Sequence, residues 1–140
     1  MSAASNFLEN KVLDHVLRYS TAPYTAPTTL YVALFKEQGS TLTNLEAGTL
    51  TDEISTSGTA YARQTITFSA ASSGTSTSSS TVTFPTATAN FGTVTAIAIM
   101  DGATAGAGNV LFYGNLTTSK LIESGDTFQI SSTNLTVSLA

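Results

Sequence analysis

The chain has 140 residues, a length typical of one domain with a real hydrophobic core, and we expect residues 1–140 to form a single domain. Only 10% of the residues are charged, the formal net charge is −4, and Lys and Arg together number five. Five basic residues cannot form a broad phosphate-binding patch, so nucleic acid is excluded as a partner. The absence of cysteine excludes disulfides and thiolate metal sites.

Residues 1–5 have neither the basic start nor the long apolar run of a secretory signal. We therefore expect synthesis in a host cytoplasm. The longest apolar run, within residues 90–101, is too short to span a bilayer and ends in an acid, so we expect no membrane partner.

Residues 6–19 are predicted to form a helix, within an N-terminal helical segment 1–22. Asn6 can cap the first turn, and Glu9 stands where a capping-box carboxylate would reach back. An apolar stripe follows helical spacing and consists of Leu8, Val12, Leu13, Val16 and Leu17. Because one amphipathic helix cannot bury itself, we expect it to pack across one end or edge of its own sheets and its flanking residues to contact another subunit.

Residues 28–140 alternate between short apolar stretches and turn signals, a pattern typical of strands. Residues 37–59 are predicted to be a long polar loop, and the Ser- and Thr-rich stretch 69–81 a turn between strands. The predicted strands lie at 28–36, 60–68, 81–84, 90–101, 109–116, 128–130 and 135–139.

The stretch 90–101 organises this pattern, because most of both its faces are apolar. Such a strand is covered on both sides, as at the centre of a sandwich. We therefore predict an all-β fold: an antiparallel β-sandwich (jelly roll) of seven or eight strands over residues 28–140, with one N-terminal α-helix.

No catalytic constellation is visible, and we predict no catalytic, cofactor-binding or metal-binding residue. His15 is the only histidine and is expected to lie on the surface without a partner. The Gly-rich stretch 102–108 lacks the Lys-Ser/Thr ending of a phosphate loop and is predicted to be a hairpin turn. The acids lack the spacing of a calcium loop and are expected to be solvated: Glu9, Asp14, Asp52, Glu53 and Asp101.

A hydrolase that uses a serine and His15 remains an alternative, although no nucleophile elbow or orienting acid accompanies them. The chain is accordingly not expected to be an enzyme. Arg63 is the other noteworthy residue, because it stands inside a strand between Tyr61 and Thr65. It can bind a carboxylate through two hydrogen bonds, or it can be an exposed strand residue whose stem covers apolar surface.

Several segments resemble a family of small virion structural proteins of tailed bacteriophages. The length and layout are similar to the jelly-roll cement (decoration) protein on the capsid of a Bordetella tailed phage. The resemblance spans nearly the whole chain and its motifs are structural. The matching segments are 7–14, 29–35, 61–64, 84–88, 93–101, 111–116 and 124–128.

This resemblance implies a capsid cement protein that binds the outside of the icosahedral shell and stabilises contacts between major capsid subunits. Its partners would be the major capsid protein and further copies of itself, most simply as a dimer, at the capsid surface of the virion and with no cofactor. The alternative is a phage tail, baseplate or fibre component whose jelly roll binds a glycan or a protein. In that case Tyr19, Tyr24 and Tyr61 are the candidate contact residues.

Overall fold

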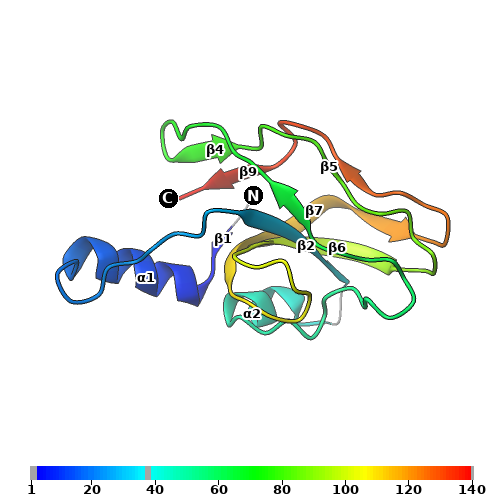
Figure 1. Ribbon diagram of the computed structural model, residues 1–140, viewed down its shortest axis with the longest axis horizontal. Coiled ribbons are helices and arrows are strands. Elements are labelled where there is room, and N and C mark those ends of the chain that lie inside the picture. The colour runs from blue at the N-terminus through cyan, green and yellow to red at the C-terminus, as the bar shows by residue number, and fades with distance from the viewer. Residues whose placement is uncertain (1–2, 37–38, 140) are drawn as a thin grey trace.

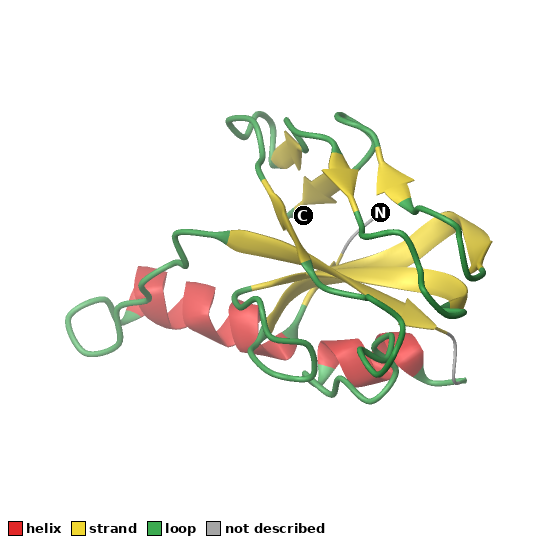
Figure 2. Cartoon of the chain, turned by 45° about the vertical axis from the view of Figure 1, so that its right-hand side comes forward, coloured by secondary structure: helices red, strands yellow, loops and turns green. Residues whose placement is uncertain are grey.

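The computed structural model describes residues 3–36 and 39–139, and its centre is a five-stranded antiparallel sheet. Two helices lie below this sheet and short strands lie above it (Figure 2). In the described ranges the elements are β1 (Ala3–Ala4), α1 (Asn6–Leu17), β2 (Leu30–Lys36), α2 (Thr41–Glu46), β3 (Gln64–Ile66), β4 (Thr75–Thr77), β5 (Val82–Thr83), β6 (Gly92–Met100), β7 (Val110–Ile122), β8 (Gln129–Ile130) and β9 (Thr136–Ser138).

The sheet has the order β1-β7-β6-β2-β3, so β6 lies in its middle, as the apolar pattern of residues 90–101 predicts (Figure 1). Alternating side chains of β2 supply two separate cores. Val32 and Leu34 belong to the core above the sheet. Ala33 and Phe35 belong to the core below it, where Leu45 of α2 joins them.

The layer above the sheet consists of two strand pairs, β4 with β9 and β5 with β8. Phe84, Phe91 and Tyr61 fill the space between these pairs and the sheet. The centroid of the Tyr61 ring is 6.2 Å from that of Phe84 and 5.8 Å from that of Phe91. The predicted antiparallel β-sandwich with an N-terminal helix is confirmed. The second layer is not one continuous sheet, because polar turns separate its short strands into two pairs.

The polar stretch 37–59 contains the short helix α2, which the sequence reading missed; of this stretch, residues 37–38 lie outside the described part. Its six residues include Leu42 and Leu45 as the only apolar pair at helical spacing. Burial of Leu45 in the lower core, rather than a periodic stripe, therefore holds this helix in place.

Two predicted strands have different lengths in the structure. The stretch 60–68 contributes only β3, since Ala60 has a positive φ of 62° and turns the chain before it. In contrast, β7 runs on to Ile122 and carries a bulge, because Asn115 pairs with Ala96 while Lys120 pairs with Val94. Such a bulge breaks up the exposed edge of β7, which β1 covers only at two positions.

Neither α1 nor α2 has the length and apolar character that a membrane crossing requires, and they are the helices of the described residues.

Candidate functional site

Two regions hold the residues that the sequence singles out: a buried cluster around Arg63 and the N-terminal arm, residues 5–27. The buried cluster joins Arg63 to Glu53 through two hydrogen bonds. The Nε atom donates to Oε1 and Nη2 donates to Oε2, each over 2.8 Å. The side chains are 0% and 4% exposed, respectively. Arg63 therefore binds a carboxylate in bidentate fashion, one of the two roles expected of it.

The remaining donors and acceptors of this ion pair bind the loop between β6 and β7. Arg63 Nη1 donates to the carbonyl oxygens of Gly102 at 2.8 Å and Ala107 at 2.9 Å. The backbone N–H of Gly106 donates to Glu53 Oε2 at 2.8 Å. The ion pair thus fastens the hairpin 102–108 to the loop before β3, two segments that are far apart in the sequence.

Tyr61 completes the buried cluster. Its hydroxyl donates to Glu53 Oε1 at 2.9 Å and accepts the backbone N–H of Leu34 at 3.0 Å. Burial raises the pKa of the Tyr61 hydroxyl well above its usual value, and the negative charge of Glu53 raises it further. The phenol therefore stays protonated and serves as a hydrogen-bond bridge between β2 and the ion pair.

The expectation that the acids are solvated is wrong for two of them. Glu53 is buried in the cluster, and buried Asp52 accepts a hydrogen bond from Asn44 Nδ2 at 3.2 Å. Asp101 closes the base of the hairpin by accepting two hydrogen bonds from Asn109, both 2.7 Å long. Asp52, Glu53 and Asp101 thus each have a structural partner. The described residues contain no group of acids or histidine placed to hold a metal ion.

The arm begins with a cap and one buried turn. Ser5, rather than the predicted Asn6, is the N-cap residue: its Oγ accepts the N–H of Leu8 at 3.3 Å and donates to the carbonyl of Val110. Glu9 consequently lies one position too late for a capping box. Leu8 is 7% exposed and anchors this first turn against the sheet.

Beyond the first turn, α1 leaves the body of the molecule, and Figure 1 shows it extending away from the sheet. The predicted packing of the whole apolar stripe on the chain's own sheets is therefore wrong after Leu8. Leu13, Val16 and Leu17 are 57%, 69% and 74% exposed, and Val12 is also exposed. We call these four residues the apolar ridge.

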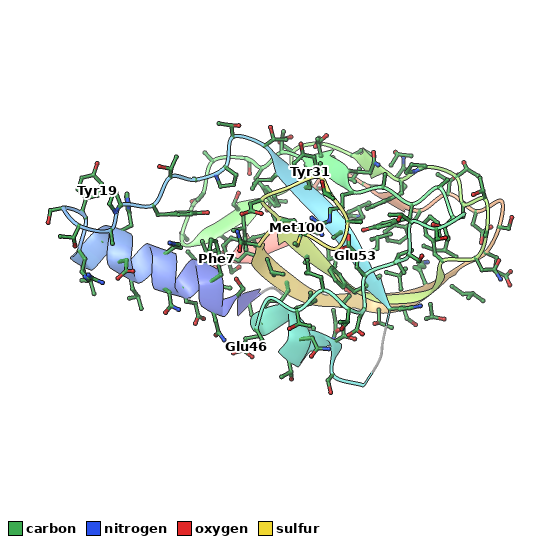
Figure 3. The ribbon with its side chains drawn as sticks, turned by 60° about the horizontal axis from the view of Figure 1, so that its bottom comes forward. Phe7, Tyr19, Tyr31, Glu46, Glu53 and Met100 are labelled. Carbon is green, nitrogen blue, oxygen red and sulfur yellow. The ribbon has the colours of Figure 1, made fainter. Side chains whose placement is uncertain are left out.

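The chain that returns toward β2, which we call the return segment (residues 18–27), contacts the side of α1 that carries Phe7 and His15. His15 Nδ1 accepts the backbone N–H of Tyr24 at 3.0 Å, and the His15 ring meets Tyr19 edge-on at 5.1 Å. Phe7 meets Tyr24 edge-on at 6.3 Å. His15 therefore connects α1 to the return segment, in contrast to the expected unpartnered surface histidine. Figure 3 shows Tyr19 at the far end of this arm, remote from Glu53.

The three tyrosines proposed as glycan contacts differ in their exposure to solvent. Tyr61 is buried and cannot face a ligand, so that expectation is wrong for it. Tyr24 is half-buried against Phe7, and burial raises the pKa of its hydroxyl, with a further contribution from the charge of Asp101. Tyr19 alone of the three is well exposed.

An open apolar groove lies beside the base of the arm, with a volume of about 350 Å³. It runs between the return segment and the β4–β9 pair and reaches the main sheet at Ile99 and Phe112. None of its lining residues is charged. We call it the arm groove; its walls include Leu8, Tyr24, Pro27, Ala71, Val137 and Leu139.

Sequence reasoning did not find Glu53 as the partner of Arg63, nor the arm groove. A signal for the buried cluster was present, since Tyr61 and Arg63 alternate onto one face and two adjacent acids, Asp52 and Glu53, lie shortly before them. The groove has no such signal, because its walls come from segments that meet only in the folded chain.

A family model, described as podophage GP4 fiber I protein gp80, matches residues 3–138. No curated protein gives a significant match to the chain. Because the matched range covers both the arm and the sandwich, the chain belongs to this family of podophage fiber proteins, and it is a structural protein of a phage virion.

Proposed function

We propose that this member of the podophage fiber family is a structural subunit of a tail fibre and acts without catalysis. The match to the fiber family over residues 3–138 carries the proposal. It supports the tail, baseplate or fibre alternative better than the capsid cement role implied by the sequence resemblance.

The shape of the chain suits a subunit that is built into a larger assembly. The body is held rigid by two cores and the buried cluster, while α1 carries a ridge of exposed apolar side chains away from it. Contiguous exposed apolar surface is typical of sites that another protein covers. The low proportion of charged residues also permits close packing between neighbouring subunits.

Copy number and position in the virion test the proposal. Quantitative mass spectrometry of purified virions measures the ratio of this chain to the major capsid protein. Gold-labelled antibodies against the chain locate it by electron microscopy. A fibre subunit gives a few to a few dozen copies per particle and label around the tail.

Hundreds of copies with label over the whole head would overturn the fibre role and support the cement role instead. In that case, heads that lack the protein should lose resistance to heat, because a ligand that binds only the assembled shell stabilises it.

A further inference from the structure

We propose that the apolar ridge of one copy lies in the arm groove of a second copy, so that the chain forms a two-fold symmetric dimer. This inference rests on the shape of the chain alone and stands apart from the fibre role. It assigns a partner to two apolar surfaces that are exposed in the described part of the chain.

The ridge and the groove cannot meet within one chain. Ser5 and Leu8 tie the first turn of α1 to the sheet at one end of the groove. From there the helix points outward, so its last two turns move away from the groove that its first turn lines (Figure 1). A convex apolar surface therefore stands next to a concave one, and only a second molecule can bring them together.

The two surfaces are also continuous, which suits a two-fold axis. Leu8 lines the groove, and Val12 and Val16 follow it at intervals of four residues, which places them on the same side of the helix. When two copies face each other with antiparallel helices, each ridge crosses toward the other groove. Both contacts form at once and are identical, as an isologous interface requires.

The area is sufficient for a stable dimer. A helix of 12 residues is about 18 Å long and about 10 Å across, so burying half of its side removes roughly 300 Å². Two helices and two groove surfaces together bury roughly 1,200 Å², the lower end of the range for specific interfaces.

The charges agree with this arrangement. The groove has no charged lining residue that would oppose an apolar helix face. Arg18 follows Lys11 by seven residues and therefore lies on the same side of α1, away from the ridge. Its Nη1 is 3.2 Å from Asp14 Oδ1, so this cation is paired within its own chain and stays outside the proposed interface.

The first experiment compares the mass of the full chain with that of two charge variants by light scattering after gel filtration. The wild-type chain should run as a dimer, Val16→Asp as a monomer, and Lys11→Asp as a dimer. Lys11 is the matched control, because it lies on the opposite side of α1, with its ammonium 5.7 Å from the centre of the Phe7 ring. Circular dichroism checks that both variants are folded.

The second experiment locates the contact through cross-linking, since the chain has no cysteine of its own. Val16→Cys on the ridge and Ala71→Cys in the groove are made in separate chains, mixed and oxidised. A disulfide between the two chains supports the proposal. Leu121→Cys, exposed on β7, replaces Ala71→Cys in the control mixture and should give no such product with Val16→Cys.

Three results would overturn the proposal. One is a wild-type chain that stays monomeric at concentrations of about 100 μM, far above the Kd of a stable dimer. Another is a dimer that Val16→Asp leaves intact. The third is oxidation that joins Val16→Cys chains only to each other, because the helices would then pair without entering the groove.

Discussion

The buried cluster and the N-terminal arm differ in whether their side chains have partners within the chain. In the cluster, each charged or polar group of Glu53, Arg63 and Tyr61 has its partner within the chain. Among the described residues, no buried side-chain nitrogen or oxygen lacks a hydrogen bond. In the arm, Leu13, Val16 and Leu17 remain mostly in water although they are apolar.

This contrast distinguishes the interactions that hold the fold of the single chain from the surface that is available to another molecule. A buried ion pair contributes little net stability when complete, but it fixes one arrangement of the loops that it joins. An exposed apolar ridge contributes nothing to the fold of the single chain and gains free energy only when another surface covers it. The side chains of the body therefore find their partners within one copy, whereas the apolar ridge of the arm is buried only when another surface covers it.

The largest effect is expected from breaking the ion pair. Arg63→Met leaves the Glu53 carboxylate buried without its cation, which should lower the free energy of unfolding by about 3–5 kcal/mol. Urea unfolding followed by circular dichroism measures the change.

The double variant Glu53→Gln with Arg63→Met removes both charges and should lose less stability than Arg63→Met alone. Coupling of this sign is what a double-mutant cycle detects for groups in contact. If Arg63→Met costs less than about 1 kcal/mol, the ion pair does not hold the loops in the way described.

The next effect lies at the boundary between body and arm. Leu8→Ala removes a side chain that is only 7% exposed and should lower the free energy of unfolding by about 2–4 kcal/mol. Urea unfolding at low protein concentration measures it. A loss as small as that of a surface substitution would mean that α1 is not anchored through its first turn.

Tyr61→Phe should have a smaller effect, about 1–3 kcal/mol, because it leaves the buried Leu34 N–H without an acceptor and deprives Glu53 of one donor. Its stability should also depend differently on pH. The raised pKa of Tyr61 means that the folded chain keeps this proton while the unfolded chain releases it near the ordinary value of 10.0.

The contribution of Tyr61 is therefore complete below pH 10 and falls as the pH rises above that value, since the unfolded state then binds fewer protons. Unfolding free energies measured from pH 8 to pH 11 should fall more steeply for the wild-type chain than for Tyr61→Phe. Parallel curves would show that Tyr61 titrates alike in both states.

The elements with a clear period were predictable from the sequence, and the contacts between distant segments were not. The apolar stretch 90–101 predicts the central strand β6, and the Leu8–Leu17 stripe predicts α1. Both patterns are local and strong. In contrast, α2 has one buried leucine, and its helix depends on the lower core to hold Leu45. Tertiary packing of this kind leaves no period in the sequence.

In the candidate site, too, the contacts between distant segments were not predictable from the sequence. An arginine between Tyr61 and Thr65 suggests a carboxylate partner, but only folding selects Glu53 over the other acids. The stripe on α1 indicates that an apolar face must be covered, and it does not say by what. Burial on the chain's own sheet was the simplest expectation, and the outward direction set by the Ser5 cap overturns it.

The smallest effect is expected at the ridge itself. Leu17→Ala removes a side chain that is 74% exposed, so the free energy of unfolding of the single chain should change by no more than about 0.5 kcal/mol. Chemical unfolding at about 1 μM protein, a concentration that suppresses weak association, measures this value. At higher concentrations the same variant should lose stability relative to the wild-type chain, because only the wild-type ridge gains from burial in a second copy. A loss of more than about 1 kcal/mol in the dilute sample would show that the ridge packs within its own chain, and the contrast between body and arm would then be wrong.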